Sequence, residues 1–277
     1  MRRAYMTFSI IVVCLNAGDK LHKTIESILS QTESDYEIVV KDGGSTDGSV
    51  KTLLPDDKMR VYCEADTGIY DAMNQALAHA KGEYVCFLNC GDYFYDRTVL
   101  KQVRQQLEKV QGRLSQTENQ AMHIFYGNIL ERKTGTLVQS NPVLNDFACY
   151  RNLPCHQACF YDRRLFGARG FDIKYKVRAD YEHFLWCLYE AKAKAVYMPL
   201  TVASYEGGGY SETRDGLKRS RQEHREIVGK YIPAKKVRKY RLTMLLTLAP
   251  LRTWLAGNQV TAGIYQKIKK KIYSVKR

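Results

Sequence analysis

The first hundred residues alternate between apolar runs and segments with helical periodicity, and this alternation restricts the chain to few folds. Apolar runs rich in β-branched and aromatic residues predict four strands, at Phe8–Leu15, Tyr36–Val40, Arg60–Cys63 and Tyr84–Leu88. Between them we expect helices at Lys20–Leu29 and from about Gly68 to Ala80, with a short helix at Ser49–Leu54. Because strands that alternate with helices usually pair in parallel, the sequence predicts an α/β fold with a mostly parallel central sheet.

The rest of the chain is less regular. It predicts a helix at Leu100–Leu114, a hairpin of His123–Leu130 with Thr136–Val138, a helix at Tyr181–Ala191 and a strand at Ala195–Tyr205. Pro199 interrupts that last strand, and a run of three glycines follows it. Residues 147–170 mix aromatic residues, cysteines and arginines without a clear period, so no element is predicted there.

The composition is that of a folded protein. With 45% hydrophobic and 26% charged residues, the chain as a whole is not disordered, collagen-like or a coiled coil. Its longest apolar runs, Phe8–Leu15 and Leu242–Leu251, are shorter than the roughly 20 residues of a membrane-spanning helix. Eight cysteines without a CxxC motif, several of them inside apolar runs, indicate reduced and buried thiols. We therefore expect a cytosolic protein.

The net charge of +14 is concentrated near the C-terminal end. Residues 227–277 contain 13 of the 43 Lys and Arg residues and none of the 29 Asp and Glu residues. The preceding part of the chain is therefore almost neutral. A basic segment of this kind, which we call the basic arm, favours a polyanionic partner, either a nucleic acid or an anionic membrane surface.

Apolar and aromatic residues are interleaved with the basic ones in this arm. Residues 242–256 (LTMLLTLAPLRTWLA) lie between the basic segments Lys235–Arg241 and Lys267–Tyr273. This pattern favours an amphipathic helix on the surface of an anionic membrane, with a break or bend at Pro250. A solvated tail, or a helix folded onto the rest of the chain, is the alternative. The arm contains no recognised nucleic-acid-binding motif, so no nucleic acid is expected.

Polar residues cluster where predicted strands end. The segment Asp42–Asp47 follows the second strand with carboxylates, hydroxyls and glycines, which suit a nucleotide base or ribose, although an ordinary turn with Asp47 as a helix cap is also typical of this pattern. Asp92 follows the fourth strand, where a carboxylate can hold Mg²⁺ or Mn²⁺ against a diphosphate. Because ligands bind beyond the carboxyl ends of parallel strands, both segments are candidate site residues.

Two predicted helices carry further candidates. Asp71 and Asn74 lie three residues apart, so they share a helix face and can reach one ligand together, although a capped helix with a solvated face gives the same pattern. Asp180 and Glu182 begin another helix, where a carboxylate acts either as a general base or as a plain N-cap. His156 is a candidate site residue in the second half of the chain, although a single histidine is commonly structural.

Five segments in this order resemble glycosyltransferase family 2, whose catalytic domain has the GT-A fold. They are Ser9–Asn16 (SIIVVCLN), Thr24–Gln31 (TIESILSQ), Val39–Gly48 (VVKDGGSTDG), Asp66–Asn74 (DTGIYDAMN) and Gly82–Asp92 (GEYVCFLNCGD). The combination is most similar to the exopolysaccharide and colanic-acid branch of the family. The resemblance is strong over residues 6–95, weaker over about 120–226, and absent from the basic arm.

The resemblance implies transfer of a sugar from a nucleoside diphosphate to an acceptor hydroxyl, usually with inversion. Asp42 and Asp66 match positions at the nucleotide, and Asp92 matches the last acid of the family's metal motif, in which Asn89 and Gly91 here replace other acids. Asp180 falls near the acceptor-side base, with Glu182 as its rival. The full predicted nucleotide set is Cys14, Asn16, Asp42, Gly44, Asp66, Gly68, Asp71 and Asn74.

The sequence thus predicts an α/β protein of the Rossmann-like GT-A type with a basic helical extension. We expect a nucleotide-sugar half over residues 1–110, an acceptor half over 111–226, and the basic arm over 227–277. The expected enzyme is a metal-dependent hexosyltransferase on the inner face of the cell membrane, acting on a saccharide acceptor that is linked to a polyprenyl lipid. A nucleic-acid- or membrane-binding protein without activity is the alternative. A sugar nucleotidyltransferase is disfavoured because the first strand is not followed by a basic, glycine-rich triphosphate loop.

Overall fold

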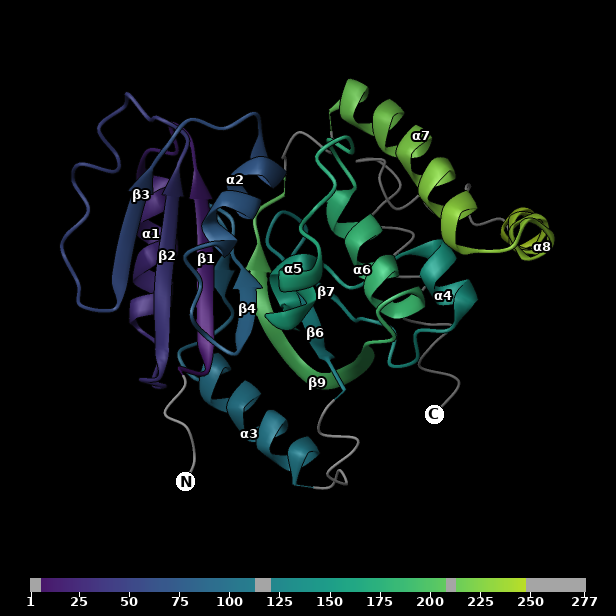
Figure 1. The fold of residues 1–277 in the computed structure, drawn as a ribbon, viewed down its shortest axis with the longest axis horizontal. Coiled ribbons are helices and arrows are strands. Elements are labelled where there is room, and N and C mark those ends of the chain that lie inside the picture. The colour runs from purple at the N-terminus through teal and green to yellow at the C-terminus, as the bar shows by residue number, and fades with distance from the viewer. Residues whose placement is uncertain (1–5, 113–120, 208–212, 248–277) are drawn as a thin grey trace. The chain divides into compact units, whose positions relative to one another are not determined.

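The computed structural model describes residues 6–112, 121–207 and 213–247 (Figure 1). The chain divides into two compact units, Met1–Ile227 and Val228–Arg277. The first unit contains the sheet and the candidate site residues. It belongs to the α/β class that the alternation predicted.

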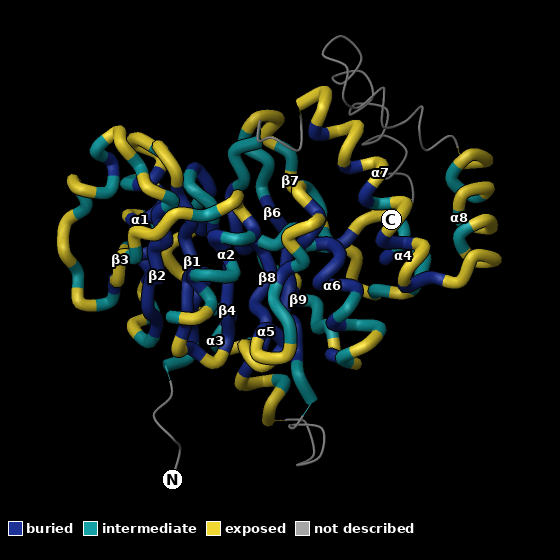
Figure 2. The backbone as a smooth tube through the Cα atoms, turned by 45° about the horizontal axis from the view of Figure 1, so that its top comes forward, coloured by how far each residue is buried: buried dark blue, intermediate teal, exposed yellow. Residues whose placement is uncertain are grey.

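Four parallel strands form one half of the sheet. They are β3 (Met59–Cys63), β2 (Tyr36–Asp42), β1 (Phe8–Cys14) and β4 (Tyr84–Phe87), in that spatial order. All residues of β1, β2 and β4 are buried, which explains why the centres of these strands are apolar runs rather than alternating patterns (Figure 2). The four predicted strands of this half are confirmed.

The other half of the sheet is mixed. It continues through β8 (Cys159–Asp162), β6 (His123–Glu131), β9 (Lys194–Tyr205) and the short β5 (Tyr93–Phe94), with β7 (Thr136–Val138) paired to β6 as the predicted hairpin. Strand β8 runs antiparallel to both β4 and β6, whereas β6 and β9 are parallel. The sheet as a whole is therefore mixed, and its N-terminal half contains only parallel pairs.

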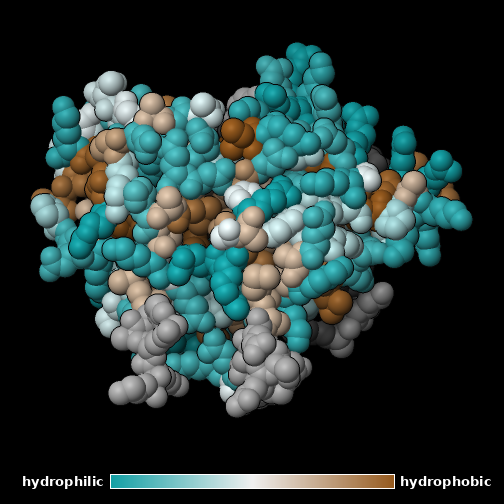
Figure 3. Space-filling view, in the orientation of Figure 1, coloured by the Kyte–Doolittle hydropathy of each residue, from teal (hydrophilic) through white to brown (hydrophobic). Residues whose placement is uncertain are grey.

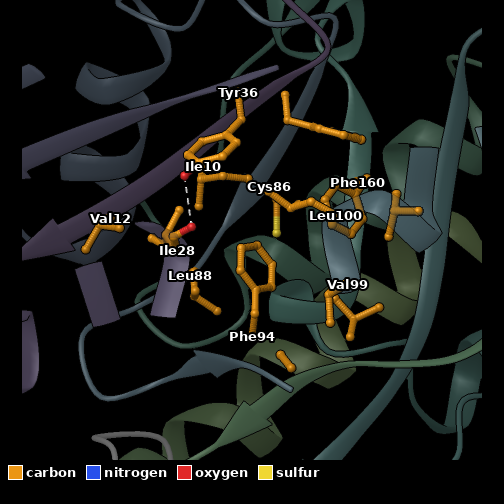
Figure 4. Close-up of a cluster of buried hydrophobic side chains, with 14 of the residues drawn as sticks. Ile10, Val12, Ile28, Tyr36, Cys86, Leu88, Phe94, Val99, Leu100 and Phe160 are labelled. Atoms are coloured by element: carbon orange, nitrogen blue, oxygen red, sulfur yellow. Dashed lines mark hydrogen bonds between the residues drawn. The ribbon is translucent and has the colours of Figure 1, made fainter. Parts of the chain in front are cut away.

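Helices cover both faces of the sheet. Those of the first unit are α1 (Asp19–Leu29), α2 (Ile69–Leu77), α3 (Val99–Gln111), α4 (Asp146–Arg151), the 3₁₀ turn η2 (His156–Ala158), α5 (Arg164–Ala168) and α6 (Ala179–Tyr189). Side chains of α1 and α3 pack with Ile10 and Val12 in a cluster where the Tyr36 hydroxyl donates to the Ile28 carbonyl at 3.0 Å (Figure 4). On the opposite face, Phe87 contacts Phe166 and Phe171.

Three predictions for local structure need correction. Ser49–Leu54 forms a turn rather than a short helix. Residues 147–170 contain α4, η2, β8 and α5, elements too short to show a hydrophobic period. Strand β9 continues through Pro199, and its pairing with β6 shifts register between Tyr126 and Ile129, which accommodates the missing N–H.

Helix α7 (Arg214–Tyr231) crosses the boundary between the two units, and α8 (Ala234–Leu246) belongs to the second. No residue of α8 is buried (Figure 2). Leu242, Leu245 and Leu246 are among its exposed residues. Over the described ranges, no helix is both long and apolar enough to cross a bilayer. The predicted break at Pro250 and the basic segment Lys267–Tyr273 lie outside the described residues.

The face of the molecule seen in Figure 3 is mostly hydrophilic, with apolar residues between polar ones. The eight cysteines are all free thiols, and five of them are buried, as the apolar runs around them predicted. Several of the candidate site residues lie at the edge of the sheet where the parallel strands end, in the loops that follow β1, β2 and β4.

Candidate active site

Asp42 is the centre of a cluster at the carboxyl end of β2. Its carboxylate accepts hydrogen bonds from the backbone N–H of Ser45 at 3.0 Å and from the Ser45 hydroxyl, and the Cys14 thiol donates to it at 3.6 Å. Asp42 and Cys14 are register partners in neighbouring strands, so parallel pairing places them side by side. Hydrogen bonding with Cys90, together with burial, raises the pKa of Cys14, which is therefore a neutral donor.

Asn16 ties the loop after β1 to this cluster. Its side-chain oxygen accepts the backbone N–H of Thr46 at 2.8 Å, and its own N–H donates to the Ser45 hydroxyl at 2.8 Å. Gly44 has φ of +98°, and a β-carbon added there would meet nothing within 4 Å, so glycine is required for conformation and not for space. These residues shape a loop with exposed backbone at the sheet edge.

Lys41 is a site residue that the sequence analysis missed. It is fully buried, and its ammonium group donates to the carbonyls of Asp42 and Glu64 and to the Asp66 carboxylate at 3.2 Å. A buried ammonium is tolerated only with such partners. The sequence did contain a sign of this role, because Lys41 is a charged residue directly between the apolar run of β2 and the segment Asp42–Asp47.

Asp66 links this cluster to the start of α2. One carboxylate oxygen contacts Lys41, and the other accepts the N–H of Gly68 at 3.0 Å. A β-carbon on Gly43 would lie 2.5 Å from Asp66, and Gly68 has φ of +136°, so both glycines are needed where they stand. The two loops therefore close against each other through backbone and carboxylate groups.

The structure gives Asp71 and Asn74 different partners. Asp71 accepts from the N–H and hydroxyl of Thr67, and the backbone hydrogen bond lowers its pKa. The Asn74 amide instead exchanges two hydrogen bonds with the Phe171 backbone, at 2.9 and 2.8 Å. The prediction that both would reach one ligand together is not supported by this arrangement, because Asn74 joins α2 to a distant loop.

Asp92 lies in the wall of a cavity of about 550 Å³ that opens beside this cluster. Asp92 is 4% exposed, and its carboxylate accepts hydrogen bonds from the backbone N–H of Glu206 at 3.0 Å and the side-chain amide of Gln157 at 2.9 Å. Burial raises the pKa of Asp92, although both hydrogen bonds oppose that shift. Gln157 and Glu206 were not predicted, because neither is near Asp92 in sequence.

The donor atoms around Asp92 fit a metal that is held jointly with a substrate. In the described part of the chain, no three His, Cys, Asp or Glu side chains converge on one point, so a closed protein site is not formed. Asn89 also lines the cavity, and its side-chain oxygen is buried without a hydrogen-bond partner among the described residues. One carboxylate and a free amide oxygen suit Mg²⁺ or Mn²⁺, which take oxygen ligands and share them with phosphates.

Asp180 lies in the wall of the same cavity, at the second residue of α6. The Tyr70 hydroxyl is 2.9 Å from one carboxylate oxygen, and His156 Nδ1 is 3.1 Å from the other. Burial would raise the pKa of Asp180, but the hydrogen bonds and charge of His156 and the hydrogen bond of Tyr70 outweigh it, so the pKa is lowered. The carboxylate is therefore anionic at neutral pH.

His156 bridges the two parts of the cavity wall. Its Nε2 is 3.1 Å from the side-chain nitrogen of Asn89, so an amide that donates there leaves the ring proton on Nδ1, facing Asp180. Asn89 precedes Asp92 by three residues. The histidine that was predicted only for the acceptor side thus connects the segment of Asp92 to Asp180.

Glu182, the rival to Asp180, does not line this cavity. It is completely buried and forms an ion pair with Arg169. On a helix, positions two apart point to different sides, so only one of the two acids reaches the cavity. This position gives Glu182 a role in packing α6 against the Arg169 loop.

Comparisons with known proteins identify the family of the chain. The family model described as glycosyl transferase family 2 matches residues 9–133. A PGL/p-HBAD biosynthesis glycosyltransferase of Mycobacterium tuberculosis is 33% identical over 213 residues, which cover 74% of this chain and 79% of the relative. The Escherichia coli enzyme WfaP, a UDP-Glc:α-D-GlcNAc-diphosphoundecaprenol β-1,3-glucosyltransferase, is 35% identical over 106 residues, or 37% of this chain and 42% of WfaP.

Solved structures show the same fold. Residues 1–349 of TarS from S. aureus, in complex with UDP-GlcNAc, align with a TM-score of 0.58 at 18% identity, covering 82% of this chain and 72% of that one. In the alignment with a structure of a longer TarS chain, the matched region covers 73% of this chain and 37% of the TarS chain. The mannosyltransferase PcManGT from Pyrobaculum calidifontis, in complex with GDP-Man and Mn²⁺, aligns with a TM-score of 0.57 at 16% identity. The alignment covers 86% of this chain and 68% of PcManGT. The chain therefore belongs to glycosyltransferase family 2 and has the GT-A fold.

Proposed function

We propose that this glycosyltransferase moves a hexosyl group, with inversion, from a nucleoside diphosphate to an acceptor hydroxyl, and that Asp180 is the general base. One observation carries the proposal. Asp180 and Asp92 line one cavity, and the Asp180 carboxylate is kept anionic by two hydrogen-bond donors. The cluster of Asp42, Lys41 and Asp66 beside it is the predicted place of the nucleotide.

The reaction follows from these positions. Asp180 takes the proton of the acceptor hydroxyl, and the acceptor oxygen attacks the anomeric carbon as the bond to the diphosphate breaks. A single displacement of this kind inverts the anomeric centre. General-base catalysis contributes about 10²–10⁴ in rate, so removal of the Asp180 carboxylate should have a large effect on turnover.

The metal of this reaction is proposed to be Mg²⁺ or Mn²⁺ held by Asp92. When bound, such an ion neutralises the charge of the leaving diphosphate. PcManGT, which shares the fold, carries Mn²⁺ in its structure. Asp92 itself is fixed by Gln157 and by the backbone of Glu206, so its carboxylate is preorganised before a ligand arrives.

The acceptor is proposed to be a saccharide linked to a polyprenyl lipid, used in surface polysaccharide assembly. The name of WfaP specifies a diphosphoundecaprenol-linked substrate, and this supports a lipid-linked acceptor for a relative in the family. We place the enzyme on the cytoplasmic face of the membrane. Helix α8 fits this location because it combines exposed leucines with five basic residues, Lys235, Lys236, Arg238, Lys239 and Arg241.

Two substitutions test the catalytic assignment. Asp180→Asn should lower turnover by about 10²–10⁴-fold while binding of the nucleotide sugar is retained, since only the base is removed. Asp92→Ala should weaken both turnover and binding of the nucleotide sugar. The measurement is turnover and binding across UDP-, GDP- and dTDP-sugars with Mn²⁺, Mg²⁺ or EDTA, which also identifies the donor. Full turnover by Asp180→Asn would refute the base assignment.

The location is tested separately by sedimentation with vesicles. The full chain should bind vesicles that contain anionic lipid, release them at high salt, and bind neutral vesicles weakly. Salt-sensitive binding to RNA without any binding to vesicles would instead support the alternative of a nucleic-acid-binding arm.

A further inference from the structure

The Tyr70 hydroxyl lies between two acceptors. Its oxygen is 2.9 Å from Asp180 Oδ1 and 2.9 Å from the backbone carbonyl oxygen of Val177. A phenol has one proton to donate, so it cannot make a full hydrogen bond to both. Burial raises the pKa of Tyr70, which keeps the phenol neutral and the proton on its oxygen.

The second acceptor is fixed in place by another helix. Glu223 of α7 is 6% exposed, and its carboxylate accepts the backbone N–H groups of Lys176, Val177 and Arg178 at 2.9, 3.0 and 2.9 Å. The side chain of Arg178 also donates to the Ser220 hydroxyl at 2.8 Å. The Val177 carbonyl is therefore held at a constant distance from Tyr70 and from the start of α6.

Tyr70 itself belongs to the helix that borders the predicted nucleotide site. It is the second residue of α2, four residues after Asp66, which binds Lys41. Its ring packs against Phe171, and the Asn74 amide fixes the Phe171 backbone one turn further along the same helix. The hydroxyl thus reaches Asp180 from a rigid support.

We propose that Tyr70 is a positioning residue for the base: its O–H points to Asp180 before proton transfer and turns to the Val177 carbonyl after it. This inference rests on the proposed base role of Asp180. Before transfer, the carboxylate needs a donor and receives one. After transfer, protonated Asp180 needs an acceptor, and the Tyr70 oxygen becomes one by turning its own proton away.

The protons balance in this scheme. The O–H bond of the acceptor breaks and an O–H bond forms on Asp180, while the freed electron pair of the acceptor oxygen forms the bond to the anomeric carbon. Tyr70 keeps its proton throughout and only changes the group to which it donates. The protonated base is therefore hydrogen-bonded without any movement of heavy atoms, because both acceptors already lie 2.9 Å away.

The test compares Tyr70→Phe with the matched control Tyr126→Phe. Tyr126 is also buried, and its hydroxyl donates to a backbone carbonyl, that of Asn141, at 2.7 Å, outside the cavity. For Tyr70→Phe we expect kcat to fall about 10–100-fold, as for the loss of a hydrogen bond to a charged group, with the donor KM within about twofold. Tyr126→Phe should keep the kcat of the parent. Melting temperatures of both variants verify that they fold.

Equal kcat in the two variants would overturn the proposal, and so would a Tyr70→Phe variant that loses donor affinity and keeps kcat. A second test is the double variant Tyr70→Phe with Asp180→Asn. If Tyr70 acts through Asp180, the double variant should have the residual turnover of Asp180→Asn alone, and a further loss of about 10–100-fold would overturn the inference. Full turnover by Asp180→Asn would instead show that the proposed function itself has failed, and the Tyr70 role with it.

Discussion

The two parts of the candidate site are built in different ways. The cluster of Lys41, Asp42 and Asp66, which we call the nucleotide cluster because we propose that the nucleotide binds there, uses residues between Cys14 and Asp71. These residues lie near the ends of parallel strands and contact one another through local loops. The cavity around Asp180 uses residues from Tyr70 to Glu206, brought together from helices, a 3₁₀ turn and loops that are distant in sequence. The first can be read from motif order, whereas the second depends on how the mixed half of the sheet folds.

The comparison also shows a difference in electrostatics. In the nucleotide cluster, charge is balanced by a fully buried lysine with three acceptors. In the cavity, the carboxylate of Asp180 is partly accessible and is held by the donors Tyr70 and His156. The first arrangement favours rigidity, and the second leaves a carboxylate that can accept a proton. Substitutions in each part should therefore have different consequences.

The largest expected effect on stability comes from substitution of Lys41 in the nucleotide cluster. Lys41→Met removes the partner of Asp66 and one donor to the carbonyls of Asp42 and Glu64, so the free energy of unfolding should fall by about 3–5 kcal/mol and binding of the donor sugar nucleotide should be lost. Chemical denaturation and donor titration measure this. Lys174→Met is the control, because Lys174 is about half exposed and its pair with Glu226 should contribute at most about 1 kcal/mol. Similar stability of the two variants would show that the buried charge is not structural.

The next effect concerns pH and the cavity. Since the pKa of Asp180 lies below its usual value, its carboxylate form, and the stability it contributes, should persist at neutral pH and be lost only as the pH falls through the acid range. His156→Ala removes a donor to the carboxylate, so the pKa should rise and the acid limb of kcat/KM should move to higher pH. We expect kcat to fall roughly 10-fold. If the acid limb of kcat/KM does not move in His156→Ala, His156 does not control the pKa of the base.

The smallest expected effect is that of a substitution at His183 of α6, a residue that does not line the cavity. Both ring nitrogens of His183 are buried and lack hydrogen-bond partners among the described residues, and burial lowers its pKa to about 3. The ring stacks on Phe166 with centroids 4.5 Å apart. His183→Phe should therefore raise the unfolding free energy by about 1 kcal/mol with unchanged turnover, as measured by thermal melting and assay. A loss of activity would give this histidine a functional role that its surroundings do not suggest.

Much of the nucleotide half was predictable for a physical reason. Strands buried on both faces are largely apolar, and parallel pairing puts their polar carboxyl ends at one edge, so the Asp42 segment could be placed at that edge without coordinates. Asp66 was added by the resemblance to the family, and the structure joins it to the cluster through Lys41. What could not be predicted there was the partner of each side chain. Asp71 and Asn74 share a helix face by spacing, yet one caps its own helix and the other binds the Phe171 backbone.

The cavity was predicted only as isolated residues. Asp180, His156 and Asp92 were each singled out from the sequence, but the sequence does not contain their distances, and it left Glu182 as a rival to Asp180. Residues 147–170 lack a period because their elements are too short, so the position of His156 beside Asp180 followed only from folding.

The sequence by itself determined the class of fold, the family and the order of the motifs, because hydrophobic period and local turn chemistry are properties of short segments. Only the tertiary structure decided that Tyr70 reaches Asp180, that Gln157 and Glu206 hold Asp92, and that Glu182 is buried with Arg169. Most of these contacts join segments far apart in the chain. Their formation depends on how helices and mixed strands pack, which no local pattern specifies.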